Sequence, residues 1–131
     1  MTPVDQTSLH DPPKSVGNCF RVCLASVMEC DIDEIPAFEI PMFDGEEWFP
    51  ILRDWLAERG LRSRWPTVEH VEHGYELETD MHLIATGPSP RFPDTLHSVV
   101  WFDGEIVHDP HPSRAGLTGD PVDWVILEKD D

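Results

Sequence analysis

Two adjacent residues, Asp103 and Gly104, constrain the fold of this chain more than any other short segment. They separate two runs, 96–102 and 105–109, that are rich in apolar and β-branched residues. An Asp-Gly pair between two such runs is a strong signal for a β-hairpin. Further strand-like runs at 61–65, 82–86 and 124–127 can extend the hairpin into a mostly antiparallel sheet.

Helical periodicity lies upstream of most of these runs. One helix is predicted to begin at Cys19, with Asn18 as its N-cap, because apolar residues recur on one face. Those residues are Phe20, Cys23, Leu24, Val27 and Met28. A second helix is predicted between Asp44, which forms a capping-box pattern with Glu47, and Gly60. Its apolar stripe consists of Trp48, Ile51, Leu52, Trp55 and Leu56.

Helices followed by an antiparallel sheet define an α+β fold. The length of 131 residues favours a single domain, 1–131, and the content of 40% hydrophobic residues is sufficient for a core. Residues 1–18 contain three prolines and are expected to form an irregular N-terminal arm.

The charge balance excludes several classes of partner. Asp and Glu total 26 against 9 Lys and Arg, which gives a formal net charge of −17. Nucleic acids and anionic membranes would be repelled, because such binding depends on Lys and Arg. A basic peptide or protein is the favoured partner. No run approaches the roughly 20 apolar residues of a membrane span.

The cysteines indicate a reducing compartment. Cys19, Cys23 and Cys30 cannot all pair internally, and the first 30 residues lack a secretory signal pattern. We therefore expect free thiols and a cytoplasmic location. Cys23 lies in the apolar stripe and is interpreted as a core residue. Cys19 differs, because a helix N-terminus favours the ionised, nucleophilic form of a thiol.

A histidine and an aspartate flank the predicted hairpin. If Asp103-Gly104 forms a two-residue loop, His97 and Asp109 fall on opposite faces of the sheet. If residues 102–104 form a three-residue loop, His97 faces Asp109 on one side. Glycine as the third loop residue favours the second register, although the sequence alone allows both. A carboxylate beside an imidazole would fix its tautomer, as in catalytic triads.

Three short motifs together resemble those of papain-like cysteine peptidases. They are Asn18-Cys19 opening an apolar helix, His97-Ser98-Val99-Val100 opening a strand, and Val107-His108-Asp109-Pro110 ending the next strand. The resemblance covers roughly residues 15–112 and is closest to the bacteriocin-processing group, which cleaves after double-glycine leaders. It implies a papain-like fold, with Cys19 as nucleophile, His97 as general base and acid, and Asp109 orienting His97.

The chain departs from this family at two positions. The family has an oxyanion-binding glutamine about six residues before the cysteine, where this chain has Pro13, and a glycine after the cysteine, where this chain has Phe20. Gln6 is the only glutamine, and it reaches the site only if the proline-rich arm loops out and returns. The remaining candidate oxyanion donors are the Cys19 backbone N–H and the Asn18 side chain.

Other interpretations remain open at this point. Trp101 follows His97 at an even spacing, so it is either a core residue or part of a substrate groove. His70 and His73 match no compact zinc pattern, and no metal or cofactor is expected. The chain is thus interpreted as a cysteine peptidase or acyl-transfer hydrolase acting on a peptide or protein, or else as an inactive, acidic binding or inhibitory protein. The sequence leaves the oligomeric state open.

Overall fold

A computed structural model describes residues 1–9 and 17–130 of the chain. Its helices are α1 (Cys19–Met28), the 3₁₀ helix η1 (Ile32–Glu34), α2 (Glu39–Phe43), α3 (Phe49–Ala57) and α4 (Val68–Glu72). Its strands are β1 (Leu61–Arg64), β2 (Leu83–Pro88), β3 (Leu96–Phe102), β4 (Glu105–His108) and β5 (Asp123–Lys129).

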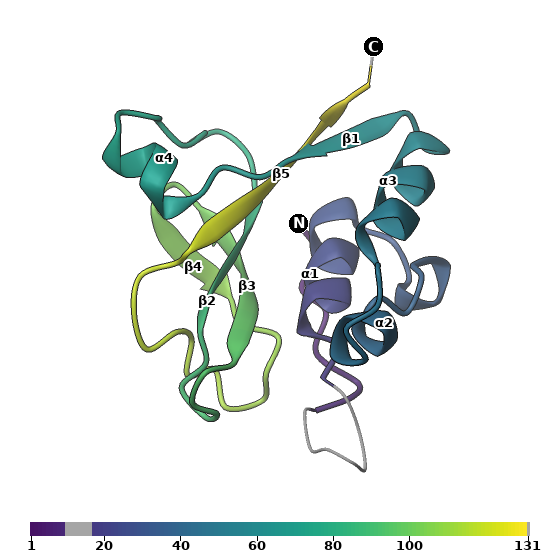
Figure 1. Cartoon of the computed structure of the whole chain (residues 1–131), viewed down its shortest axis with the longest axis horizontal. Helices are drawn as coiled ribbons and strands as arrows, with labels where there is room; N and C mark the ends of the chain where they lie inside the picture. Colours follow the sequence, from purple (N-terminus) through teal and green to yellow (C-terminus); the bar gives the residue numbers. More distant parts are fainter. Residues whose placement is uncertain (10–16, 131) are drawn as a thin grey trace.

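The five strands form one sheet in the order β1-β5-β2-β3-β4, and all neighbouring strands are antiparallel. Helices α1, α2 and α3 lie together on one side of it, whereas α4 lies on the other (Figure 1). The expected α+β class with a mostly antiparallel sheet is confirmed. The model also confirms the expected strand near residues 61–65.

Alternating residues of the central strands build two apolar clusters. Ile84, Val100 and Val125 pack with residues of α1 and α3 in the first cluster. Leu83, Val99 and their neighbours form the second cluster, which also contacts α4. Because Val100 alternates with Val99, β3 contributes to both clusters and connects α1 to the rest of the sheet.

The second predicted helix begins later than its capping pattern indicates. Asp44 terminates the short helix α2, which the sequence did not predict, and does not cap α3. Helix α3 begins at Phe49, with Pro50 in its first turn, where proline's fixed φ suits a helix start. Ile51 was predicted to lie in the apolar stripe but is 43% exposed.

The β3–β4 hairpin has a two-residue turn, whereas the sequence favoured a three-residue loop. Asp103 and Gly104 form a two-residue turn, with φ of 49° and 84°, and Phe102 pairs with Glu105. Positive φ at both positions gives the turn whose twist matches paired strands, so the predicted three-residue loop was wrong. An irregularity follows, because Trp101 pairs with Ile106 while Val100 pairs with His108.

This irregularity, a β-bulge, determines where Asp109 falls. Val107 is the extra residue of β4, so every later residue is displaced by one position relative to β3. Without the bulge, the continued register would place Asp109 opposite Ser98. With the bulge, Asp109 lies on the same side of the sheet as His97. The sequence predicted this placement, but from a three-residue loop that does not form.

Candidate active site

Cys19 occupies the first position of α1, as predicted. Asn18 precedes it at the N-cap position, but its side chain makes no cap hydrogen bond. Its Nδ2 donates to Thr7 Oγ1 at 3.0 Å, and its Oδ1 accepts from the Ser8 N–H at 3.4 Å. The predicted capping role of Asn18 is therefore wrong, because the side chain holds the N-terminal arm.

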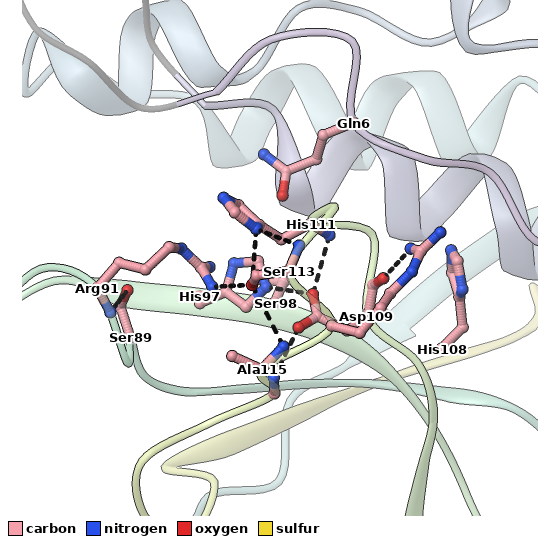
Figure 2. A network of polar contacts seen from close by, with 12 residues as sticks. Gln6, Ser89, Arg91, His97, Ser98, His108, Asp109, His111, Ser113 and Ala115 are labelled. Atoms are coloured by element: carbon pink, nitrogen blue, oxygen red, sulfur yellow. Dashed lines mark hydrogen bonds and ion pairs between the residues drawn. The ribbon is translucent and has the colours of Figure 1, made fainter.

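A buried hydrogen bond joins His97 to Asp109. The distance from His97 Nε2 to Asp109 Oδ1 is 2.7 Å, and both side chains are at most 5% exposed. Asp109 Oδ1 also accepts from the His111 N–H at 2.9 Å, and Oδ2 accepts from the Gly116 N–H at 2.7 Å. The segment after β4 thus wraps the carboxylate and fixes its orientation (Figure 2).

The Cys19 thiol contacts the other end of this pair. The His97 side chain and the backbone and side chain of Ser98 lie close enough to the thiol to stabilise its ionised form. Since His97 Nε2 is directed at Asp109, Nδ1 is the ring nitrogen that remains for sulfur. The model therefore brings together the three residues that the sequence singled out, in the order Cys19, His97, Asp109.

These contacts set the charge of the nucleophile. Burial opposes ionisation of Cys19, but the hydrogen bond and positive charge of His97 and the bonds from Ser98 outweigh it, so the thiol pKa is lowered. Burial also opposes a charged His97, yet the bonds to Asp109 and Cys19 raise its pKa to about 9. The lowered pKa of the thiol and the raised pKa of the imidazole both favour a thiolate paired with an imidazolium.

Asp109 is ionised in this arrangement. Burial alone would raise its pKa, but the bond from His97 and the N–H groups of His111 and Gly116 lower it to about 2. The carboxylate thus compensates the positive charge of His97 inside the protein.

Ser98 is a functional candidate that sequence reasoning missed. It is 4% exposed, and its Oγ lies 3.0 Å from Thr86 Oγ1 on β2. Strand alternation predicts that Ser98 and His97 point to opposite faces, which gave no reason to expect both at one sulfur. A small polar residue on the β3 face toward α1 was the only available signal.

The arm brings Gln6 back to the site. The Gln6 N–H donates to the Pro110 carbonyl at 2.9 Å, and its side chain lies above His111 (Figure 2). Gln6 Nε2 donates to the Ser8 carbonyl at 3.1 Å, while Oε1 is buried without a partner among the described residues. Pro13, at the position of the family's glutamine, lies outside the described residues.

The other two cysteines and Trp101 lie outside this site. Cys23 is fully buried in the first cluster, and burial raises its pKa well above the usual value. Burial and the nearby Glu34 raise the pKa of Cys30. Trp101 belongs to the second cluster, 5.9 Å from Trp124 between ring centroids, which supports its core interpretation over a role in a substrate groove.

Within residues 1–9 and 17–130, no group of three or more His, Cys, Asp or Glu side chains is arranged to hold a metal ion. In the same part of the chain, no helix combines the length and apolar character needed to cross a bilayer. No protein-family model, curated protein or solved structure matches the chain.

Proposed function

We propose that this protein is a cysteine-dependent peptidase or related acyl-transfer hydrolase with a papain-like fold, acting on a peptide or protein in the cytoplasm. The carrying observation is that His97, hydrogen-bonded to Asp109 at 2.7 Å, interacts with the Cys19 thiol and lowers its pKa. This arrangement lowers the pKa of a thiol at a helix start, which is what a cysteine nucleophile requires.

The proposed reaction begins with attack of the Cys19 thiolate on an acyl carbonyl carbon. A carbon–sulfur bond forms, and the carbonyl electron pair moves to oxygen. The tetrahedral intermediate collapses, and the His97 imidazolium gives its proton to the departing amine, leaving a thioester. Water, with His97 as general base, or an amine then attacks the thioester carbonyl. The carbon–sulfur bond breaks, the Cys19 thiolate is restored, and the product is a carboxylic acid or the acylated amine.

Asp109 is the positioning residue in this scheme. It holds the Nε2 proton of His97, so Nδ1 remains directed at sulfur and at the leaving group. Its bonds from the His111 and Gly116 N–H groups keep the carboxylate fixed while His97 gains and loses a proton.

The developing oxyanion needs hydrogen-bond donors. The Cys19 backbone N–H at the start of α1 is one proposed donor, because the first N–H groups of a helix have no partner within the helix. The Gln6 side-chain amide is the second, after rotation away from the Ser8 carbonyl. Asn18 is not proposed as a donor, since its amide nitrogen is bonded to Thr7. One lost oxyanion donor costs roughly 10²–10³ in rate.

The fold supports the proposal in one further respect. A cysteine-bearing helix packs on an antiparallel sheet whose neighbouring strands supply the histidine and the aspartate. The chemistry needs no cofactor. The net charge of −17 favours a substrate with basic character and disfavours nucleic acids and anionic membranes.

Alkylation of the thiols tests the proposal. Iodoacetamide at neutral pH should label Cys19 much faster than Cys23 or Cys30, because Cys19 alone of the three has a lowered pKa. Peptide mass spectrometry gives the rate at each thiol. His97→Ala should slow the labelling of Cys19 by about tenfold or more, since a pKa change of one unit changes the thiolate fraction up to tenfold.

His73→Ala is the matched control, because His73 is an exposed histidine that caps the C-terminal end of α4 and lies outside the site. It should leave the labelling of Cys19 unchanged. Equal labelling of all three thiols, or an unchanged rate in His97→Ala, would exclude the proposed activity and favour an inactive acidic binding protein.

A further inference from the structure

The turn before β3 carries a cation that is not neutralised by the described part of the chain. Of the seven arginines, six form ion pairs with carboxylates: Arg21, Arg53, Arg59, Arg62, Arg64 and Arg114. Arg91 has no carboxylate partner among the described residues, and its Nη1 donates to Ser113 Oγ at 3.0 Å. In a chain with 26 acidic residues, such a guanidinium is unusual.

The turn that carries Arg91 is held in place. Ser89 Oγ accepts from the Arg91 N–H at 3.2 Å and from the Phe92 N–H at 3.3 Å. The Ser89 N–H donates to the Thr95 carbonyl at 2.9 Å, which closes the turn just before β3. Arg91 is therefore presented on an ordered turn, and most of its five N–H donors remain available.

Ser113 connects Arg91 to a second donor, His111. Ser113 Oγ accepts from Arg91 and from the Ala115 N–H at 3.3 Å, so its own proton is directed to His111 Nδ1 at 2.8 Å. The Ser113 N–H also donates to His111 Nδ1, at 3.0 Å. Because Nδ1 accepts, the proton of neutral His111 lies on Nε2, where it can be donated to a ligand.

His111 places this pair beside His97, the candidate general base. Its ring stands edge-on to the His97 ring, with centroids 6.3 Å apart. Figure 2 shows the Arg91 side chain extending toward His97 and Ser113, on the side opposite His108. Burial and the charge of Arg91 lower the pKa of His111, which keeps it a neutral donor.

We propose that Arg91 and His111 form a recognition site for one carboxylate of the substrate, beside the bond that Cys19 attacks. A guanidinium binds a carboxylate through parallel hydrogen bonds, and the His111 Nε2–H supplies a further donor. The proposal rests on the proposed function for its location and specifies the substrate class: a peptide or acyl compound with an acidic side chain or free terminal carboxylate near the scissile bond.

This local preference is compatible with the acidic surface. The net charge of −17 repels anions at long range, so a carboxylate is admitted only where a dedicated cation compensates for that repulsion. A peptide with basic residues and a single carboxylate is attracted by the acidic surface and can also bind Arg91. An extended polyanion could bind Arg91, but the acidic surface would repel it.

Two alkylating reagents of similar size test the proposal. Iodoacetate carries a carboxylate and iodoacetamide does not, so the ratio of their rate constants at Cys19 reports recognition of the anion. Arg91→Gln should lower this ratio about fivefold, because it should slow iodoacetate more than iodoacetamide. Arg53→Gln removes the same charge from an exposed site paired with Asp54, and it should leave the ratio unchanged.

Two substitutions of His111 test whether its Nε2–H donor, rather than its ring as a structural element, is needed for the preference for iodoacetate. His111→Gln retains a side-chain N–H donor and should keep most of the ratio, whereas His111→Phe should lower it. Equal ratios in Arg91→Gln and Arg53→Gln would overturn the proposal. So would equal losses with both reagents, which would indicate a structural role for Arg91.

A binding measurement makes the result independent of thiol reactivity. In the Cys19→Ala protein, N-acetylaspartate amide, which carries one carboxylate, should shift the NMR signals of the His111 ring, and N-acetylasparagine amide, which carries none, should not. Arg91→Gln should abolish the shift. If iodoacetamide does not react preferentially with wild-type Cys19, the proposed function fails while this titration still decides on the carboxylate site. Absence of a shift overturns the carboxylate site alone.

Discussion

At the scale of single residues, the ionisation states of Cys19, His97 and Asp109 depend on one another. Cys19 is partly buried, which by itself disfavours the thiolate, and its ionisation depends on His97 and Ser98. His97 in turn depends on Asp109 to remain charged. A change at Asp109 should therefore alter the reactivity of a sulfur that it does not touch.

The pH dependence of alkylation should show this coupling. In the wild type, the rate at Cys19 at neutral pH should exceed that of an ordinary thiol, because the thiol pKa is lowered and His97 stays protonated until its own pKa of about 9. In Asp109→Asn, the His97 pKa should fall and the thiol pKa should rise. The rate at neutral pH should then be about tenfold lower and should increase steeply toward alkaline pH.

Mass spectrometry of the Cys19 peptide across a pH series provides this measurement. Asp94→Asn is a suitable control, because Asp94 lies in the exposed turn between β2 and β3. A wild-type profile that rises only near the pKa of an ordinary thiol would contradict the predicted ion pair.

At the scale of elements, the sequence predicted the central parts of the fold. The helix from Cys19, the strand 96–102 and the hairpin agree with the model, since periodicity and turn residues act locally. The capping role of Asn18 and the start of α3 were wrong. The Asn18 side chain binds the N-terminal arm, and Pro50 sets the start of α3. A cap predicted from a single residue does not outweigh such effects.

Part of the site was also predictable from local sequence patterns. His97 and Asp109 were paired correctly, but through a loop that does not form, and the bulge at Val107 produced the same side for a different reason. A bulge has no reliable signal in one sequence. The contact of Ser98 with sulfur and the return of Gln6 depend on distant segments, so local pattern could not predict them.

The hairpin turn gives a test at this scale. Gly104→Ala should lower the free energy of unfolding by about 1 kcal/mol, because Gly104 has a φ of 84° and a Cβ there is strained although it meets no neighbour. Gly119→Ala is the control, since Gly119 has no positive φ and its added Cβ would make an ordinary contact of 3.6 Å with Pro88. Urea denaturation measures both. Equal effects would contradict the assigned turn.

At the scale of the whole molecule, the site lies between two parts of the structure. Cys19 belongs to the helical side, and His97 and Asp109 belong to the sheet side. The N-terminal arm contacts both: the Val4 N–H donates to Ser26 Oγ on α1 at 2.9 Å, and the Val4 carbonyl accepts from His108 Nε2 at 2.8 Å. The arm therefore helps to fix the distance between Cys19 and His97.

Charge is the other property of the whole molecule, and it gives a prediction about stability. With a net charge of −17, repulsion among carboxylates should outweigh the few surface ion pairs. Raising the sodium chloride concentration from low ionic strength should therefore raise the Tm, because salt screens both interactions and repulsion is the larger. Calorimetry over a salt series tests this. A falling Tm would show that the arginine pairs dominate instead.

The contact between Ser98 and Thr86 has a consequence for the dynamics of the site. A hydroxyl group has a single proton, so Ser98 cannot donate to the sulfur and to Thr86 Oγ1 at the same time. While the sulfur is anionic, Ser98 must donate to it and accept from Thr86. Once the sulfur is acylated, that demand disappears and both hydroxyls are able to rotate. Covalent modification of Cys19 would then change the orientation of a hydroxyl on the neighbouring strand β2.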